Sequence, residues 1–74
     1  MSGLIYLEFV KNLSDNDLKV AGNEIIEFKN TSILPDGILK KVKEKVRSVI
    51  GHTGYEYAIV ERIVIDEIIN RYCK

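Results

Sequence analysis

Apolar and polar residues alternate along the beginning of the chain. Ile5, Leu7 and Phe9 fall on one face of an extended segment, and residues 4–10 as a whole are of types that favour strands. A two-residue period of this kind is typical of a β-strand with one buried face. The pattern therefore predicts a first strand over residues 4–10.

The next segment combines turn residues with short apolar stretches. Residues 12–17 are rich in Asn, Asp and Ser, whose side chains bond to their own backbone in turns. A glycine–asparagine pair at 22–23 indicates a tight turn, so we expect a hairpin with strands near 18–21 and 24–29. A short helix beginning at Ser14 is the alternative.

After Pro35 the apolar residues recur with a period of 3.6 residues, as on one face of a helix. Proline and aspartate at 35–36 suit the first turn of a helix, and Gly51 suits its end. The predicted helix over residues 38–50 has polar residues on its remaining surface and one apolar stripe. The stripe consists of Ile38, Leu39, Val42, Val46, Val49 and Ile50.

A second helix is expected from about residue 54 to residue 72. Thr53 and Glu56 have the spacing of a capping box, in which each side chain bonds to the backbone N–H of the other residue. Because the segment from Tyr55 to Val60 is β-branched and aromatic, a strand there is the alternative.

The first half of this second helix is apolar nearly all round, which requires cover on two sides. Either another chain or the N-terminal hairpin would provide that cover. We predict an interface between chains, formed by Tyr57, Ile59, Val60 and Ile63.

Together these elements predict an α+β fold, in which a three-stranded antiparallel sheet packs against a C-terminal αα-hairpin. The 74 residues suit a single domain, 1–74. Cys73 is the one cysteine, so no internal disulfide is expected. No apolar stretch approaches the length of a membrane span, and no secretory leader is visible, so we expect a cytoplasmic protein.

Charge is balanced overall but clustered locally. The formal net charge is zero, so global charge does not favour nucleic acid or an anionic membrane. Five basic residues nevertheless fall within the helix at 38–50, where they form either a solvated face or a contact for phosphates or an acidic partner. These residues are Lys40, Lys41, Lys43, Lys45 and Arg47.

Two short patterns have counterparts in nucleic-acid-binding families. Gly51-His52-Thr53-Gly54, between two helices, resembles the GxxG loop of KH domains, which holds a nucleic-acid backbone. Its two middle residues are not cationic here. The plain alternative is a helix end followed by a helix cap.

A longer pattern begins with the Leu34–Pro35 pair, continues through the apolar helix and a threonine-containing turn, and ends in a long apolar helix. It resembles in part the helix–turn–helix portion of ribbon-helix-helix DNA-binding proteins. The resemblance implies a dimer that buries the last helix, and a strand before Pro35 that reads the major groove. The alternation before Pro35 is out of phase with that of the family.

Residues that carry chemistry are sparse. His52 is the one histidine, which argues against a multi-histidine metal site. The acidic pair at 15 and 17 lacks the glycine and the closing glutamate of a calcium loop. We therefore expect no enzyme, no cofactor and no small-molecule substrate.

The functional prediction is a small non-enzymatic regulator that binds a larger macromolecule, as a homodimer. The alternative is a nucleic-acid-binding regulator that uses the basic helix and the turn at 51–54. Its predicted contacts, which would equally serve an acidic partner, are Lys40, Lys41, Lys43, Arg47, His52 and Thr53.

Overall fold

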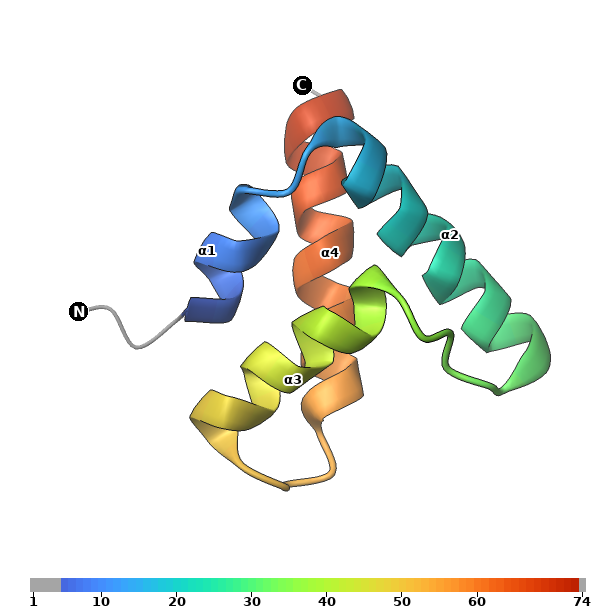
Figure 1. Cartoon of the computed structure of the whole chain (residues 1–74). Helices are drawn as coiled ribbons and strands as arrows, with labels where there is room; N and C mark the ends of the chain where they lie inside the picture. Colours follow the sequence, from blue (N-terminus) through green and yellow to red (C-terminus); the bar gives the residue numbers. More distant parts are fainter. Residues whose placement is uncertain (1–4, 74) are drawn as a thin grey trace.

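The computed structural model describes residues 5–73, and these residues form four α-helices and no strand. Figure 1 shows their arrangement. The helices are α1 (Ile5–Lys11), α2 (Asp15–Thr31), α3 (Ile38–Ile50) and α4 (Glu56–Tyr72). The prediction of an α+β fold with a three-stranded sheet is therefore wrong, and the chain is all-helical over its described length.

The predicted hairpin at 18–29 is instead the middle of α2. Ser14 caps this helix, since its hydroxyl accepts a hydrogen bond of 3.1 Å from the backbone N–H of Asp17. The alternative helix beginning at Ser14 identified this start correctly. Leu18, Ala21 and Ile25 are buried at helical spacing, so their burial against other helices outweighs the turn signal of the glycine–asparagine pair.

The predicted first strand is α1, apart from Leu4, which lies outside the described residues. Val10 is buried, and Tyr6, Phe9 and Leu13 pack against the same core. These four positions follow the spacing i, i+3, i+4, i+7 of a helix face. Among the alternating residues Phe9 packs on the core but Ile5 is 48% exposed, so the helical spacing rather than the alternation marks the buried face of this short segment.

The helix predicted over residues 38–50 is confirmed as α3. Gly37, at its N-cap, has no capping side chain. The cap comes from α2 instead, because a Glu24 carboxylate oxygen accepts a hydrogen bond of 2.7 Å from the N–H of Leu39. A Cβ at Gly37 would collide with that carboxylate, so the glycine makes room for the cap.

Helix α4 is confirmed as a helix rather than a strand, although it begins two residues later than expected. The predicted capping box does not form, because each of its two side chains bonds to a backbone N–H one residue away from the expected one. The Thr53 hydroxyl accepts from the N–H of Tyr55 at 3.1 Å, and the Glu56 carboxylate accepts from the N–H of Gly54 at 3.0 Å. Both bonds fix the loop before α4.

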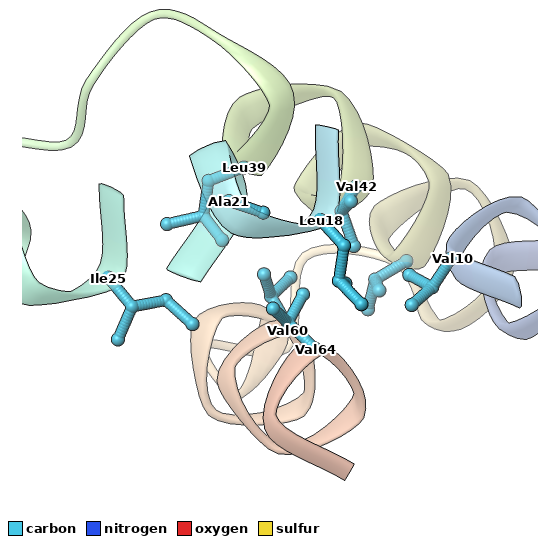
Figure 2. Packing of buried hydrophobic residues seen from close by; sticks show 9 residues of the cluster. Val10, Leu18, Ala21, Ile25, Leu39, Val42, Val60 and Val64 are labelled. Atoms are coloured by element: carbon cyan, nitrogen blue, oxygen red, sulfur yellow. The ribbon is translucent and has the colours of Figure 1, made fainter. Parts of the chain in front are cut away.

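Helix α4 lies at the centre of the fold and contacts each of the other three helices. Helix α2 runs antiparallel to it, because Asp15 pairs with Arg71 at one end and Phe28 packs against Tyr57 at the other. Figure 2 shows how the helices meet at side chains of the core. The core consists of Val10, Leu18, Ala21, Ile25, Leu39, Val42, Val46, Val60 and Val64.

One arginine fastens the N-terminal helices to the end of α4. Arg71 donates hydrogen bonds to the Glu67 carboxylate at 2.8 Å and to the Asp15 carboxylate at 3.1 Å. It also donates to the carbonyl of Lys11 at 2.9 Å and more weakly to that of Val10 at 3.4 Å. The Val10 carbonyl also accepts a hydrogen bond of 3.2 Å from the N–H of Leu13, so the carbonyl that depends most on Arg71 is that of Lys11, at the end of α1.

Candidate interaction site

The four residues predicted to form an interface lie on the sides of α4 that its own chain covers. Val60 is 0% exposed and belongs to the core. Tyr57, Ile59 and Ile63 are partly buried and pack against that core. Val60 therefore offers no surface to a second chain, because the residues expected to form a sheet fold into helices that cover α4.

The neighbours of Tyr57 and Ile63 identify these covering helices. The rings of Phe28 and Tyr57 have centroids 4.5 Å apart, which joins α2 to the beginning of α4. On another side of α4, Ile63 and Leu7 line the same hollow beside α1. The apolar first half of α4 is thus explained by two helices of the same chain. Whether these residues also meet a partner stays a prediction.

The basic residues of α3 differ in exposure and in the groups that they contact. Lys40 and Lys41 are exposed, and Lys40 lies 3.5 Å from the Asp36 carboxylate. Lys43 is half-buried. The Lys45 ammonium lies 5.5 Å from the centroid of the Phe9 ring, a cation–π contact between α3 and α1.

Arg47 faces a buried carboxylate. Its guanidinium lies 3.8 Å from Glu56, which is nearly inaccessible to solvent. The backbone N–H of Glu56 itself, together with Gly54 N–H, Arg47 and His52, lowers the pKa of the Glu56 carboxyl, although its burial acts in the opposite sense. Arg47 and Glu56 therefore hold the loop at 51–55 against α3.

The loop itself places His52 and Thr53 at the surface. Both are exposed, and Gly51 and Gly54 on either side have positive φ angles of 80° and 88°. A side chain would be strained at those two angles, so the glycines serve the turn between α3 and α4. The Thr53 hydroxyl already accepts a bond from the backbone.

The strand that the ribbon-helix-helix resemblance implied is absent from the segment before Pro35. Lys29 and Thr31 belong to α2, and Ser32 ends that helix in the left-handed conformation with φ 63°. In that family the strand is the element that enters the major groove. The structure therefore removes the proposed DNA-reading element, while contact of α3 with nucleic acid stays a prediction.

An open groove of about 630 Å³ runs between α2 and α4. Helix α4 contributes Ile65, Ile68 and Tyr72 to its lining. The α2 side consists of Lys19, Gly22, Asn23, Ile25, Ile26 and Lys29. The surface is mainly aliphatic, with one aromatic ring at the C-terminal end of α4.

Several large apolar side chains around this groove are exposed to solvent. Ile26 is 59% exposed, Tyr72 is 47% exposed and Ile65 is 37% exposed. Ile69 is exposed as well, so residues 65, 69 and 72 form an apolar stripe along the outer side of α4. These residues leave apolar area in contact with water, which a bound partner would remove.

Gly22 shapes the floor of the groove. A Cβ placed on Gly22 would lie 3.1 Å from Cδ1 of Ile68, so the missing side chain permits the close approach of α2 to α4. Glycine at this position, in the middle of α2, therefore serves packing rather than a turn.

The polar residues that line the groove are Lys19, Asn23, Lys29 and Tyr72, with no Asp or Glu among them. The Lys29 ammonium donates to the Glu61 carboxylate at 2.8 Å, and this hydrogen bond raises the pKa of Lys29. Lys29 remains 59% exposed in its side chain. The groove is thus apolar in its middle, and it carries one lysine near each end of α2, Lys19 near the beginning and Lys29 near the end.

Reasoning from the sequence missed this groove. It gave Ile65, Ile69 and Tyr72 no role, and it placed Ile26 in the strand expected near 24–29. The adjacent pair Ile25–Ile26 was a usable signal, because neighbours on a helix point about 100° apart. Once the segment is taken as a helix, Leu18, Ala21 and Ile25 share one face, and Ile26 lies beside that face.

Neither a metal-binding group of side chains nor a helix that could span a membrane is present within residues 5–73. No group of three His, Cys, Asp or Glu side chains within this range is placed to hold a metal ion. None of the described helices has the length and apolar character of a membrane span. Fold and groove together define a small all-helical chain with an open, mainly apolar groove. Searches against protein-family models, curated proteins and solved structures gave no match.

Proposed function

We propose that the chain is a non-enzymatic interaction protein that binds another protein through the groove between α2 and α4. The observation that supports this proposal is the row of exposed apolar side chains, Ile26, Ile65 and Tyr72, around one open hollow. Contiguous apolar surface of this kind marks binding sites on small proteins.

The energetic reason is the removal of apolar area from water. Each square ångström buried contributes about 25 cal/mol before the costs of association are subtracted. Isoleucine and tyrosine side chains also lose little conformational freedom on binding compared with long charged chains. A partner that covers Ile26, Ile65 and Tyr72 therefore gains its affinity from apolar side chains that two packed helices present.

The predicted homodimer does not depend on the groove. Its original reason was the apolar first half of α4, which α1 and α2 cover in the structure. A dimer through the outer stripe of α4 stays a prediction, and sedimentation velocity over a wide range of protein concentration tests it. A single monomeric species throughout would refute it.

Selection from a displayed library of random single-helix peptides tests the proposed function without assuming a partner. We expect selected peptides to shift the amide resonances of α2 and α4 around Ile26 and Ile65. Replacing Ile26 with glutamate should abolish this binding, because the charge would lie inside the groove.

The matched control is Ile33→Glu, the same substitution at a position that is 71% exposed and outside the groove. Circular dichroism of both variants verifies that helix content is kept. Peptides that bind Ile26→Glu as well as the unmodified chain, or that shift α3 instead, would refute the proposal.

A further inference from the structure

We infer that the occupant of the groove is one amphipathic helix of another protein, with acidic residues flanking its apolar face. This inference rests on the proposed function and adds the shape and the charge of the partner. Both follow from the lining of the groove.

The dimensions fit a single helix. Lys19 and Lys29 both line the groove and lie ten residues apart on α2, which corresponds to about 15 Å along the helix axis. Anchors at i, i+3 or i+4 and i+7 of a partner helix span about 10 Å. Three apolar anchors therefore fit between the two lysines, and the partner helix would complete a three-helix group with α2 and α4.

The concave shape disfavours a second copy of the same chain. In a two-fold dimer the same patch meets itself, so it must be self-complementary. Two grooves placed face to face would leave their hollows unfilled, and close packing does not tolerate such voids. A convex element such as a helix fills the hollow directly.

The polar lining sets the sign of the partner's charge. Lys19 and Lys29 are cationic, and no carboxylate belongs to the lining. Since Lys29 already bonds to Glu61 at 2.8 Å, a partner carboxylate there must share or replace that contact. Lys19 therefore contributes more to charge selection than Lys29 does.

Three matched peptides test the inference. Each is a single helix of about four turns with leucine anchors at i, i+3 and i+7, and the flanking positions carry glutamate in the first, glutamine in the second and lysine in the third. Affinity is measured by fluorescence anisotropy, and the site by amide shifts. We expect the glutamate peptide to bind most tightly and the lysine peptide most weakly, with shifts in α2 and α4.

Charge reversal at one lysine gives the decisive comparison. Lys19→Glu should weaken the glutamate peptide about tenfold, the size expected when an attractive contact becomes repulsive, and should strengthen the lysine peptide. Lys41→Glu is the matched control, because Lys41 is exposed on α3 and is not part of the groove lining. It should leave both affinities unchanged.

Each contrary result is distinct. Equal binding of the three peptides in the groove would overturn the acidic partner while leaving the proposed function intact. Shifts confined to α3 and lost in Lys41→Glu would overturn the inference, as would the absence of any groove shift. Laurate is titrated as a further probe, and groove shifts with laurate alone would assign the site to an anionic amphiphile instead.

Discussion

Replacing Val60 with alanine removes the equivalent of two methylene groups from the centre of α4. Figure 2 shows Val60 and Val64 pointing from α4 towards the side chains of the neighbouring helices. Because Val60 is 0% exposed, the full transfer free energy is lost, about 1.6 kcal/mol at about 0.8 kcal/mol per methylene. The cavity left behind adds about 1 kcal/mol.

Alanine recovers part of this loss through its higher helix propensity, about 0.5 kcal/mol. The net destabilisation is therefore about 2 kcal/mol. A chain of 74 residues has a total free energy of unfolding of about 4–11 kcal/mol, so the variant should remain folded in water. Urea denaturation followed by circular dichroism measures the difference as a lower midpoint with an unchanged slope.

Val20→Ala is the control, since it makes the same deletion on the exposed side of α2, where Val20 is 38% exposed. We expect its free energy of unfolding to change by no more than about 0.5 kcal/mol. Equal effects of the two substitutions would refute the placement of Val60 in the core. A midpoint that rises with protein concentration, and loses that dependence in Val60→Ala, would place Val60 in an interface between chains.

Three further predictions concern the groove floor, the α3–α4 loop and the basic helix. Gly22→Ala should stabilise the chain by at most about 1 kcal/mol, because alanine favours the helix and the end of the Ile68 side chain can move into the groove. Peptide affinity should fall in the same variant, because the displaced side chain occupies part of the groove. A destabilised variant with unchanged peptide affinity would contradict this prediction. The lowered pKa of Glu56 means that its contribution to stability is present above its usual pKa of 4.5 and is lost as pH falls through the lower folded value. Denaturation midpoints of Glu56→Gln should therefore fall less on acidification than those of the unmodified chain, and parallel curves would count against the assignment. Serine at three lysines should abolish any gel shift with nucleic acid and leave peptide binding to the groove unchanged, so a surviving shift would exclude the basic face of α3. The three lysines are Lys40, Lys41 and Lys43.

The C-terminal half of the fold was predictable because several signals agree there. The apolar stripe of α3 repeats over more than three turns, with Pro35 before it and Gly51 at its end. A stripe of that length is difficult to satisfy with any other structure. The start of α4 was less certain, because Thr53 and Glu56 bond to the loop rather than to each other.

The N-terminal half was not predictable from local pattern. In the seven residues of α1, the alternating set contains Phe9, which packs on the core, but also Ile5, which is exposed. In α2 the glycine at 22 suggested a turn, yet its role depends on Ile68, which is distant in sequence. Tertiary contacts of this kind override local propensity and are invisible before the fold is known.

The groove depends on both halves at once. Its α4 side contains Ile65 and Tyr72, for which the sequence pattern predicted no contact, and its α2 side contains Ile26, which the pattern placed in a strand. Only the antiparallel approach of α2 to α4 decides which isoleucines are covered and which remain exposed. A single error in one element was enough to hide the site.

An isotope-edited NOE experiment between Gly22 and Ile68 tests the central claim most directly, namely that α2 lies along α4 and forms the groove with it. The account predicts a strong cross-peak between the Gly22 Hα protons and the Ile68 Cδ1 methyl, together with ring contacts between Phe28 and Tyr57. Absence of these peaks, with Hα–Hα contacts between residues 18–21 and 24–29 in their place, would contradict it.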